Sequence, residues 1–456
     1  MKVDVSNANV SDNKDTLGVG MLVGVLAKYE NGTIQTLSSG TVSNLTIEGK
    51  LEAVLPSSVK QTDAYGIGGI IGYANLDNKN RTIQINGCTN DADVSGNVNT
   101  GGIVGRLDGT FRYNNGTKYT ASKLKQKADI LNCNDNGLIL CDNISTQKAG
   151  STIEGNYFGG IVGYSNQALV YNAVSALGRS GSFRYSSDDQ KELLQGRYVG
   201  GIAGYGEHTL LSNCSTEKNG YVLGDEYVGG IAGGLGGGVP DAIQASTESG
   251  ASVTTNASYV IGNGYVGGIV GENSTNVTLK NCINQGVAAG YKQYVGGIVG
   301  YNQADSTIAD CASYLSDYDN SVYNMIVHKW KATASFAGGI AGYNDGAITF
   351  SDKSEEITVK SVSSIVVGQN YVGGIAGFND ENATIDVHYT LIGGRIYAYG
   401  KCAGGAIWAE CIYKSIEPGT YNQTTEYSGA ILCWWCDRCK CCEPDTGYDY
   451  EPDAHR

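Results

Sequence analysis

The sequence predicts an all-β protein, a single elongated β-solenoid (β-helix) of about ten irregular coils with loop insertions and a Cys-rich C-terminal cap. Three observations support this fold class. A glycine-rich core recurs along the chain, and short alternating segments separated by turn residues lie between its copies. The composition of 66 Gly, 31 Tyr and 5 Pro also favours strands and turns over helices.

The repeated core is represented best by residues 294–302, Tyr-Val-Gly-Gly-Ile-Val-Gly-Tyr-Asn. The distance between copies ranges from 29 residues, between Gly200 and Gly229, to 58 residues, between Gly101 and Gly159. A fixed structural unit with insertions of different length explains this spacing. The first glycines of the Gly-Gly pairs are Gly68, Gly101, Gly159, Gly200, Gly229, Gly267, Gly296, Gly338, Gly373 and, where the repeat decays, Gly404.

The repeat divides the chain into three parts. We expect residues 1–60 to form an N-terminal entry coil or cap and residues 61–400 to form the solenoid. Residues 401–456 are expected to hold a degenerate last repeat and the Cys-rich segment. Because an array grows by adding units, a length of 456 residues does not imply two or three globular domains.

The shortest complete unit, residues 267–295, predicts three strands per coil. They are 267–271, 277–280 and 287–289, joined by segments of turn composition. The glycine pairs indicate either a positive φ or a close approach of another backbone. Ile298 and Val299 are expected on opposite faces of one strand, which predicts a wall covered on both sides by a loop or by another molecule.

Several cysteines follow an Asn, Asp or Gly and lie three residues after an apolar residue. Such spacing predicts that the chain turns just before the cysteine, which then enters the core. A disulfide between Cys282 and Cys311 of adjacent coils is one possibility. The favoured alternative is free, buried thiols, because stacked Cβ atoms lie about 4.8 Å apart, farther than a disulfide prefers. The predicted core thiols are Cys88, Cys133, Cys214, Cys282 and Cys311.

An aromatic residue follows many of the cores at a constant offset, and stacking of coils would align these residues as a ladder. The favoured role of the ladder is to stabilise the solenoid, and the alternative is to bind glycan chains. Its predicted members are Tyr73, Tyr164, Tyr205, Tyr301, Tyr343 and Phe378. Turn chemistry explains the nearby Asn166, Asn302, Asn344 and Asn379.

Two insertions have a distinct composition. The longest one follows Gly105, and we expect it to be a solvated loop rather than an anion site. The other extends from Ser313 to Ser335, and its aromatic residues either pack on their own coil or anchor a partner. The basic residues of the first are Lys118, Lys123, Lys125 and Lys127, and the aromatic residues of the second are Tyr314, Tyr318, Tyr323 and Trp330.

Five of the 13 cysteines lie in residues 433–442. In an exported protein we favour disulfides that staple the last coil, with Cys402 and Cys411 as further partners. A metal site is the weaker alternative, with Cys433, Cys436, Cys439 and Cys442 as candidate ligands. No other cofactor is expected.

The Gly-Gly-Ile-Val-Gly-Tyr-Asn core, followed by Asn-Cys, resembles the GLUG repeat of bacterial cell-surface proteins from about Tyr65 to Phe378. The resemblance implies an exported, adhesin-like protein at the bacterial surface. Its partner would be a glycan or protein on another surface, or copies of itself. Some such proteins attach the repeats to a metallopeptidase, but this chain has no His-Glu-x-x-His motif.

Charge and hydropathy restrict the function further. The net charge of -14 argues against a nucleic-acid partner, and no run of about 18 apolar residues predicts a membrane span. Residues 1–7 lack the apolar stretch of a signal peptide, so an exported protein would be present here as a mature form or a fragment.

The acidic residues are scattered and form no recurring pair, which argues against catalysis. We therefore expect a non-catalytic adhesin or stalk module that uses solenoid faces and inserted loops. The alternatives are a self-assembling extracellular fibre subunit and a polysaccharide-degrading β-helix enzyme.

Overall fold

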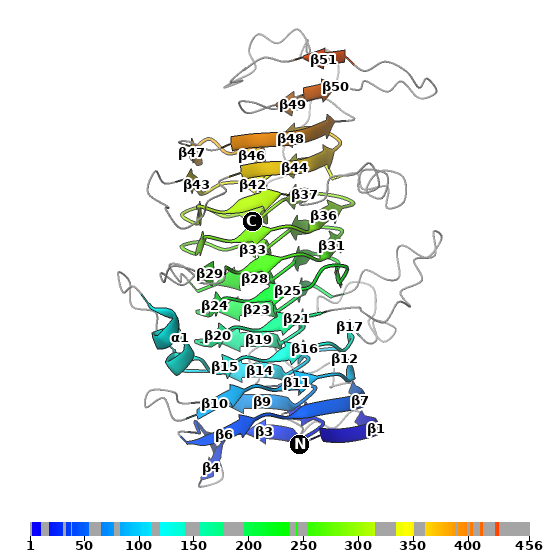
Figure 1. Ribbon diagram of the computed structural model, residues 1–456, viewed down its shortest axis with the longest axis vertical. Coiled ribbons are helices and arrows are strands. Elements are labelled where there is room, and N and C mark those ends of the chain that lie inside the picture. The colour runs from blue at the N-terminus through cyan, green and yellow to red at the C-terminus, as the bar shows by residue number, and fades with distance from the viewer. Residues whose placement is uncertain are drawn as a thin grey trace.

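The computed structural model is an elongated stack of coils that follow one another along the long axis (Figure 1). It describes residues 2–10, 18–30, 33–37, 39–53, 65–76, 83–111, 119–141, 156–176, 196–237, 243–244, 253–314, 334–350, 361–387, 391–398, 402–404, 411–413 and 425–427. Strands of successive coils pair in parallel. The prediction of an all-β solenoid is therefore confirmed, while the predicted Cys-rich cap lies outside the described residues.

One coil, from Tyr265 to Gly290, shows how the unit is built. Its strands are β32 (Tyr265–Gly267), β33 (Val270–Asn273), β34 (Thr278–Lys280), β35 (Ile283–Asn284) and β36 (Val287–Gly290). The prediction of three strands per coil was wrong for two reasons. The chain bends at residues 268–269 and divides the expected strand 267–271 between two sheets, and β35 forms a further strand that was not predicted.

Equivalent strands form sheets, which we number in the order in which the chain visits them. Sheet 1 contains β2 (Gly18–Gly20), β8 (Gly66–Gly68), β13 (Thr100–Gly101), β18 (Tyr157–Gly159), β22 (Tyr198–Gly200), β27 (Tyr227–Gly229), β32, β37 (Tyr294–Gly296), β41 (Phe336–Gly338), β45 (Tyr371–Gly373) and β49 (Cys402–Gly404). Sheet 2 contains β3 (Val23–Leu26), β9 (Ile71–Asn75), β14 (Val104–Asp108), β19 (Val162–Asn166), β23 (Ala203–Glu207), β28 (Ala232–Gly236), β33, β38 (Val299–Asn302), β42 (Ala341–Asn344) and β46 (Ala376–Asn379).

The other walls follow. Sheet 3 contains β6 (Gly40–Ser43), β10 (Ile83–Asn86), β15 (Ile130–Leu131), β20 (Leu169–Tyr171), β24 (Leu210–Ser212), β29 (Ile243–Gln244), β34, β39 (Thr307–Ala309), β43 (Ala347–Phe350) and β47 (Thr384–Val387). Sheet 4 contains β1 (Lys2–Val10), β7 (Thr46–Ala53), β11 (Thr89–Asn90), β12 (Asp93–Gly96), β16 (Asn134–Asp135), β17 (Ile139–Cys141), β21 (Val174–Ser175), β25 (Ser215–Thr216), β30 (Thr255–Asn256), β35, β40 (Ala312–Tyr314), β44 (Ser361–Gly368) and β48 (Leu391–Ala398). Sheet 5 contains β26 (Tyr221–Leu223), β31 (Tyr259–Gly262) and β36.

Two antiparallel pairs also occur among the described strands. They are β4 (Lys28–Glu30) with β5 (Thr33–Gln35), and β50 (Cys411–Tyr413) with β51 (Thr425–Tyr427).

The first glycine of each pair lies where sheet 1 packs closely on sheet 2. A Cβ atom at Gly267 would lie 1.9 Å from the carbonyl oxygen of Val270 and 2.7 Å from that of Ile298 in the next coil. Gly267 does not have a positive φ, so close backbone approach explains this glycine. The glycine-bearing face of sheet 2 is thus covered by sheet 1 of the same solenoid, not by a loop or another molecule.

The second glycine leaves room for a polar side chain of sheet 4. A Cβ atom at Gly268 would lie 2.3 Å from Nδ2 of Asn284, and one at Gly102 would lie 2.2 Å from Oδ1 of Asp135. The polar partners of the second glycines form a column that we call the inner polar ladder. Its described members are Asn90, Asp135, Ser175, Thr216, Asn256, Asn284 and Ser313.

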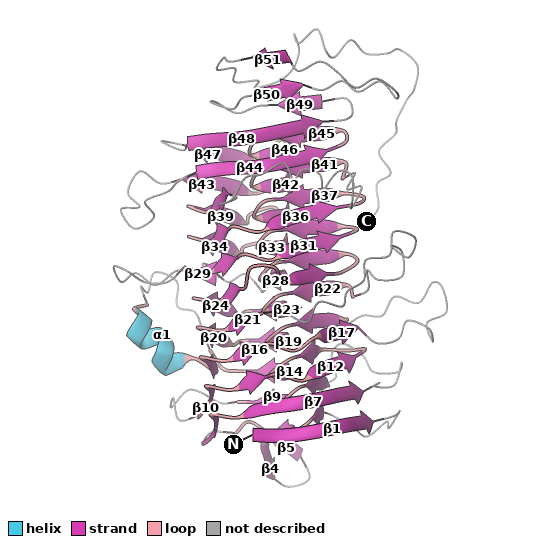
Figure 2. Ribbon diagram, turned by 45° about the vertical axis from the view of Figure 1, so that its right-hand side comes forward, coloured by secondary structure: helices cyan, strands magenta, loops and turns pink. Residues whose placement is uncertain are grey.

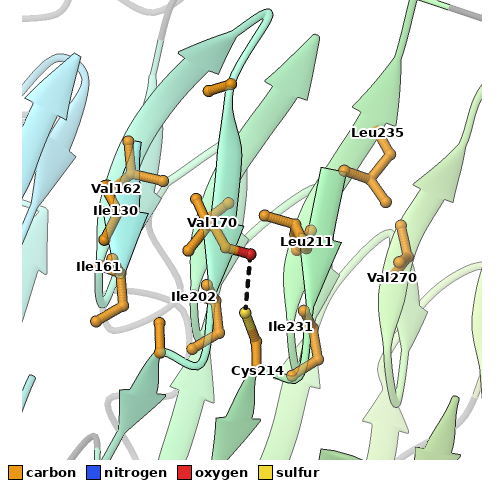
Figure 3. Close-up of a cluster of buried hydrophobic side chains, with 14 of the residues drawn as sticks. Ile130, Ile161, Val162, Val170, Ile202, Leu211, Cys214, Ile231, Leu235 and Val270 are labelled. Carbon is orange, nitrogen blue, oxygen red and sulfur yellow. Dashed lines mark hydrogen bonds between the residues drawn. The ribbon is translucent and has the colours of Figure 1, made fainter. Parts of the chain in front are cut away.

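The main core runs along the stack between sheets 2, 3 and 4 (Figure 3). Ile298 and Val299 are both fully buried in it, so the prediction that they point to opposite faces was wrong. The bend between sheets 1 and 2 accounts for this, since Ile298 lies in the bend and not inside a strand. A second apolar column contains Val228 and Val266 of sheet 1 and Val260 of sheet 5.

The corners before the cysteines have the predicted conformation. Asn132, Asn213, Asn281, Asp310 and Gly87 have φ values between 51° and 65° and each directly precedes a core cysteine. This left-handed region is costly for most residues and is tolerated by Gly, Asn and Asp. The turn predicted from the spacing is therefore confirmed.

A second polar column runs along the ends of the sheet 2 strands, just before the turns to sheet 3. Asn273 donates from Nδ2 to Oδ1 of Asn302 at 2.8 Å, Asn302 donates to Asn344 at 2.8 Å, and Asn344 donates to Asn379 at 2.7 Å. Turn chemistry alone was therefore an incomplete explanation of these asparagines. Asn166 is not in this column, because its neighbour Ser165 occupies the corresponding register.

Part of the Lys-rich insertion is helical, which corrects the prediction of a loop. Helix α1 (Ala121–Lys127) begins after Thr120, whose Oγ1 accepts from the backbone N–H of Lys123. It lies outside sheet 3 (Figure 2), where Leu124 is buried against Leu131 and Leu169. Among the described residues, no helix is long and apolar enough to cross a membrane.

Candidate functional site

The predicted aromatic ladder lies on sheet 2, but it is interrupted. Three pairs of aromatic residues occupy paired positions on neighbouring strands. These pairs are Tyr164 with Tyr205, Tyr301 with Tyr343, and Tyr343 with Phe378. Between Tyr73 and Phe378, three coils hold another residue at the corresponding position, namely Arg106, Gly234 and Glu272. Tyr73 pairs with Arg106 at the N-terminal end of this column.

A second aromatic column, which the sequence analysis did not identify, runs beside the first on sheet 1. Its members occupy the position two residues before the first glycine, and their centroids lie 4.4 to 5.2 Å apart from coil to coil. The signal was present as the recurring Tyr-Val-Gly. The members are Tyr157, Tyr198, Tyr227, Tyr265, Tyr294, Phe336 and Tyr371.

The two columns touch and together form what we call the aromatic face. Tyr294 of sheet 1, for example, lies 5.2 Å from Tyr343 of sheet 2, measured between ring centroids. Within the sheet 1 column three of the six neighbouring pairs are nearly parallel, at 8° to 10°, and the other three are tilted at 42° to 47°. The nearly parallel rings cover much of each other's π faces.

Exposure of the aromatic face increases along the chain. Tyr73, Tyr157 and Tyr164 are buried, whereas Tyr371 and Phe378 are 37% and 38% exposed. Burial raises the pKa of Tyr205 and Tyr301 to about 12, with smaller contributions from nearby carboxylates. These phenols are therefore neutral hydrogen-bond donors at physiological pH.

Carboxylates accept hydrogen bonds from the phenols. Glu207 accepts from Tyr164, and Asp380 accepts from Tyr343. Glu272 accepts from the Tyr198 hydroxyl at 3.2 Å and from Nε2 of Gln303 at 2.6 Å. Burial raises the pKa of Glu272, and the two hydrogen bonds oppose that rise.

Two arginines also lie on the aromatic face. The Arg106 guanidinium carbon lies 4.9 Å from the ring centroid of Tyr164, and its Nε donates to Asp108 at 3.1 Å. The Arg197 guanidinium lies over Tyr198 and donates to Glu226 at 2.8 Å. Each guanidinium thus contacts both a ring and a carboxylate.

The predicted core cysteines are buried and have free thiols. They lie just after the corners, and Figure 3 shows the Cys214 thiol donating to the carbonyl oxygen of Val170, at 3.7 Å. Burial raises the pKa of Cys214 to about 12. Cys311 contacts the preceding coil, where its sulfur accepts a hydrogen bond from the backbone N–H of Cys282 at 3.4 Å.

Other predicted sites lie partly or wholly outside the described residues. These are the C-terminal candidates Cys433, Cys436, Cys439 and Cys442, the insertion residues Tyr318, Tyr323 and Trp330, and Lys118. Within the part of the chain that the structure describes, no group of three or more His, Cys, Asp or Glu side chains is placed to hold a metal ion.

Comparison with known proteins gives one match. The family model of the GLUG motif matches residues 293–313, which include β37, β38 and β39. Searches among curated proteins and among solved structures found no match. The chain therefore carries a GLUG-repeat region, which indicates an extracellular repeat protein.

Proposed function

We propose that this chain is a non-catalytic adhesin or stalk module of a bacterial cell surface, whose aromatic face binds a glycan or protein on another surface. The observation that carries the proposal is the increase in exposure along that face, which ends at Tyr371 and Phe378. Exposed aromatic residues are frequent anchors of binding sites, whereas most of the other large apolar side chains of this solenoid are buried.

The stack itself suits the role of a stalk. Each coil pairs with its neighbours through backbone hydrogen bonds, and two polar ladders and two aromatic columns link the coils further. Such a one-dimensional array resists bending and holds a binding face away from its attachment point. The carboxylates of the face accept hydrogen bonds from phenols and amides, an arrangement that supports recognition more than acid–base catalysis.

The test is binding of the full chain, displayed on beads, to arrays of glycans and of extracellular proteins. We expect binding that is lost in the double variant Tyr371→Ala, Phe378→Ala. The matched control is Tyr221→Ala, Tyr259→Ala, which removes another stacked pair, with ring centroids 5.1 Å apart, from sheet 5. Equal loss in both variants, or release of reducing sugars from a polysaccharide, would contradict the proposal.

A further inference from the structure

The aromatic face already binds two guanidinium groups, those of its own Arg106 and Arg197. In each case one or two tyrosine rings lie below the guanidinium and a carboxylate accepts from its Nε, at 3.1 Å from Asp108 and 2.8 Å from Glu226. The carboxylate supplies charge-assisted hydrogen bonds, and the ring supplies a cation–π contact. The face therefore recognises arginine in two separate coils.

The C-terminal end of the same face repeats these groups in a more exposed setting. Tyr343 and Phe378 are stacked at 5.1 Å, and Asp345 and Asp380 belong to the adjoining turns. Burial raises the pKa of Asp345, and the negative charges of Asp380 and Asp305 raise it further. Among the residues that the structure describes, no lysine or arginine pairs with Asp345 or Asp380.

The ring geometry at this end favours a cation over a sugar. Tyr371 and Phe378 are nearly perpendicular, at 85°, and Phe336 stacks on Tyr371 at 10°. A glycan chain that stacks on aromatic rings needs a row of open ring faces, whereas a guanidinium needs one ring and a carboxylate beside it. Tyr343 meets the second requirement, because its hydroxyl donates to the Asp380 carboxylate.

We propose that Tyr343, Asp345, Tyr371, Phe378 and Asp380 bind an arginine side chain of a basic segment in a protein partner, as the same face binds Arg106 and Arg197. This inference rests on the proposed function and names its class of partner. The net charge of -14 would also draw a basic partner toward the solenoid and accelerate its association.

The test uses the full chain and a fluorescent peptide that carries three arginines separated by glycines, with binding followed by anisotropy. Two matched peptides carry lysine or citrulline instead, and citrulline keeps the planar shape without the charge. We expect the arginine peptide to bind at least about fivefold more tightly than the lysine peptide. The citrulline peptide should bind more weakly than both.

Three variants locate the site. Asp345→Asn, Asp380→Asn should weaken binding of the arginine peptide about tenfold or more, since both charges are lost. Phe378→Leu keeps apolar area and should reduce the preference for arginine over lysine. The control Glu381→Gln, Asp386→Asn removes the same charge from two exposed positions of the same coil and should change affinity less than about twofold.

Equal affinity for the three peptides would overturn the inference, and this comparison needs no variant to fold. Unchanged binding in the Asp345→Asn, Asp380→Asn variant would also overturn it. Binding of a β-glucan oligosaccharide that is lost in Tyr371→Ala, Phe378→Ala, with no preference for arginine, would refute the arginine site and leave the proposed function standing. If the chain bound nothing on the bead arrays and bound neither the arginine peptide nor the oligosaccharide, both proposals would be contradicted.

Discussion

Asp135 is the ionisable member of the inner polar ladder, and its replacement by Asn should stabilise the protein at neutral pH. The side chain is fully buried, and its pKa is raised well above the ordinary value because burial disfavours the carboxylate. Asn90 donates to its Oδ1 at 2.7 Å, and Ser175 donates to its Oδ2 at 3.4 Å.

The amide can replace these contacts, as other coils demonstrate. Asn284 accepts from Asn256 at 2.8 Å, accepts from the N–H two residues later at 3.1 Å, and donates to Ser313 at 3.4 Å. Asp135→Asn should therefore keep its hydrogen bonds and remove the buried charge, a gain of about 1–3 kcal/mol at pH 7.

The pH dependence gives the sharper check. Because the folded-state pKa of Asp135 is raised, its contribution to wild-type stability is fully present below the unfolded pKa of about 4 and is lost as the pH rises through the folded value. The stability advantage of Asp135→Asn should thus be near zero at about pH 4 and grow toward neutrality.

Urea unfolding followed by circular dichroism measures this difference at each pH. Asp225→Asn makes the same chemical change at an exposed residue, and the stability of this variant should differ little from that of the wild type at every pH. An advantage that does not change with pH, or a loss of stability at pH 7, would refute the reasoning.

Four other substitutions or titrations test the scaffold. Gly268→Ala places a Cβ 2.1 Å from the Gly297 carbonyl oxygen and should cost about 3 kcal/mol or more in urea unfolding; unchanged stability would contradict the packing. Asn281→Val should cost about 1–2 kcal/mol more than Asn281→Gly, since its φ is 56°; equal stabilities would refute the corner argument. Asn302→Leu leaves partners above and below unpaired and should cost about 2–4 kcal/mol in thermal unfolding. The pKa of Tyr301 is raised to about 12 in the folded protein. The contribution of this phenol to stability is therefore complete below its unfolded-state pKa of about 10 and is lost as the pH rises through 12. Alkaline unfolding, followed by tyrosinate absorbance, should therefore occur at a higher pH in Tyr301→Phe, and an unchanged midpoint would argue otherwise.

The stacking of the solenoid could be predicted because each repeat places the same residue type at the same position of successive coils. The corner before each cysteine was also predictable, since a three-residue spacing between two buried positions requires a turn and Asn tolerates one. Both inferences use local sequence alone.

The bend after Gly267 could not be predicted in this way. A run of Gly and apolar residues is typical of one buried strand. The close approach of the Val270 carbonyl oxygen, and of the Ile298 carbonyl oxygen in the following coil, to Gly267 arises only in the folded stack. Helix α1 was missed for a similar reason. Its one buried side chain, Leu124, gives no helical periodicity, and its partners Leu169 and Leu210 belong to later coils.

The aromatic face was predicted only in part. The sheet 2 column followed from a constant offset, but the interruptions at Arg106 and Glu272 became meaningful only when the second column brought tyrosines beside them. The greater exposure of Phe378 coincides with its place in β46, the last described strand of sheet 2, where no further described strand of that sheet follows.

Hydrogen exchange of the full chain with and without the arginine peptide tests the central claim, that ligands bind at the C-terminal end of the aromatic face. Backbone amides of β45 and β46 and of the turn at residues 380–383 should exchange more slowly in the complex, while those of α1 and sheet 5 should not change. Protection confined to α1 or sheet 5, with none in β45 and β46, would contradict it.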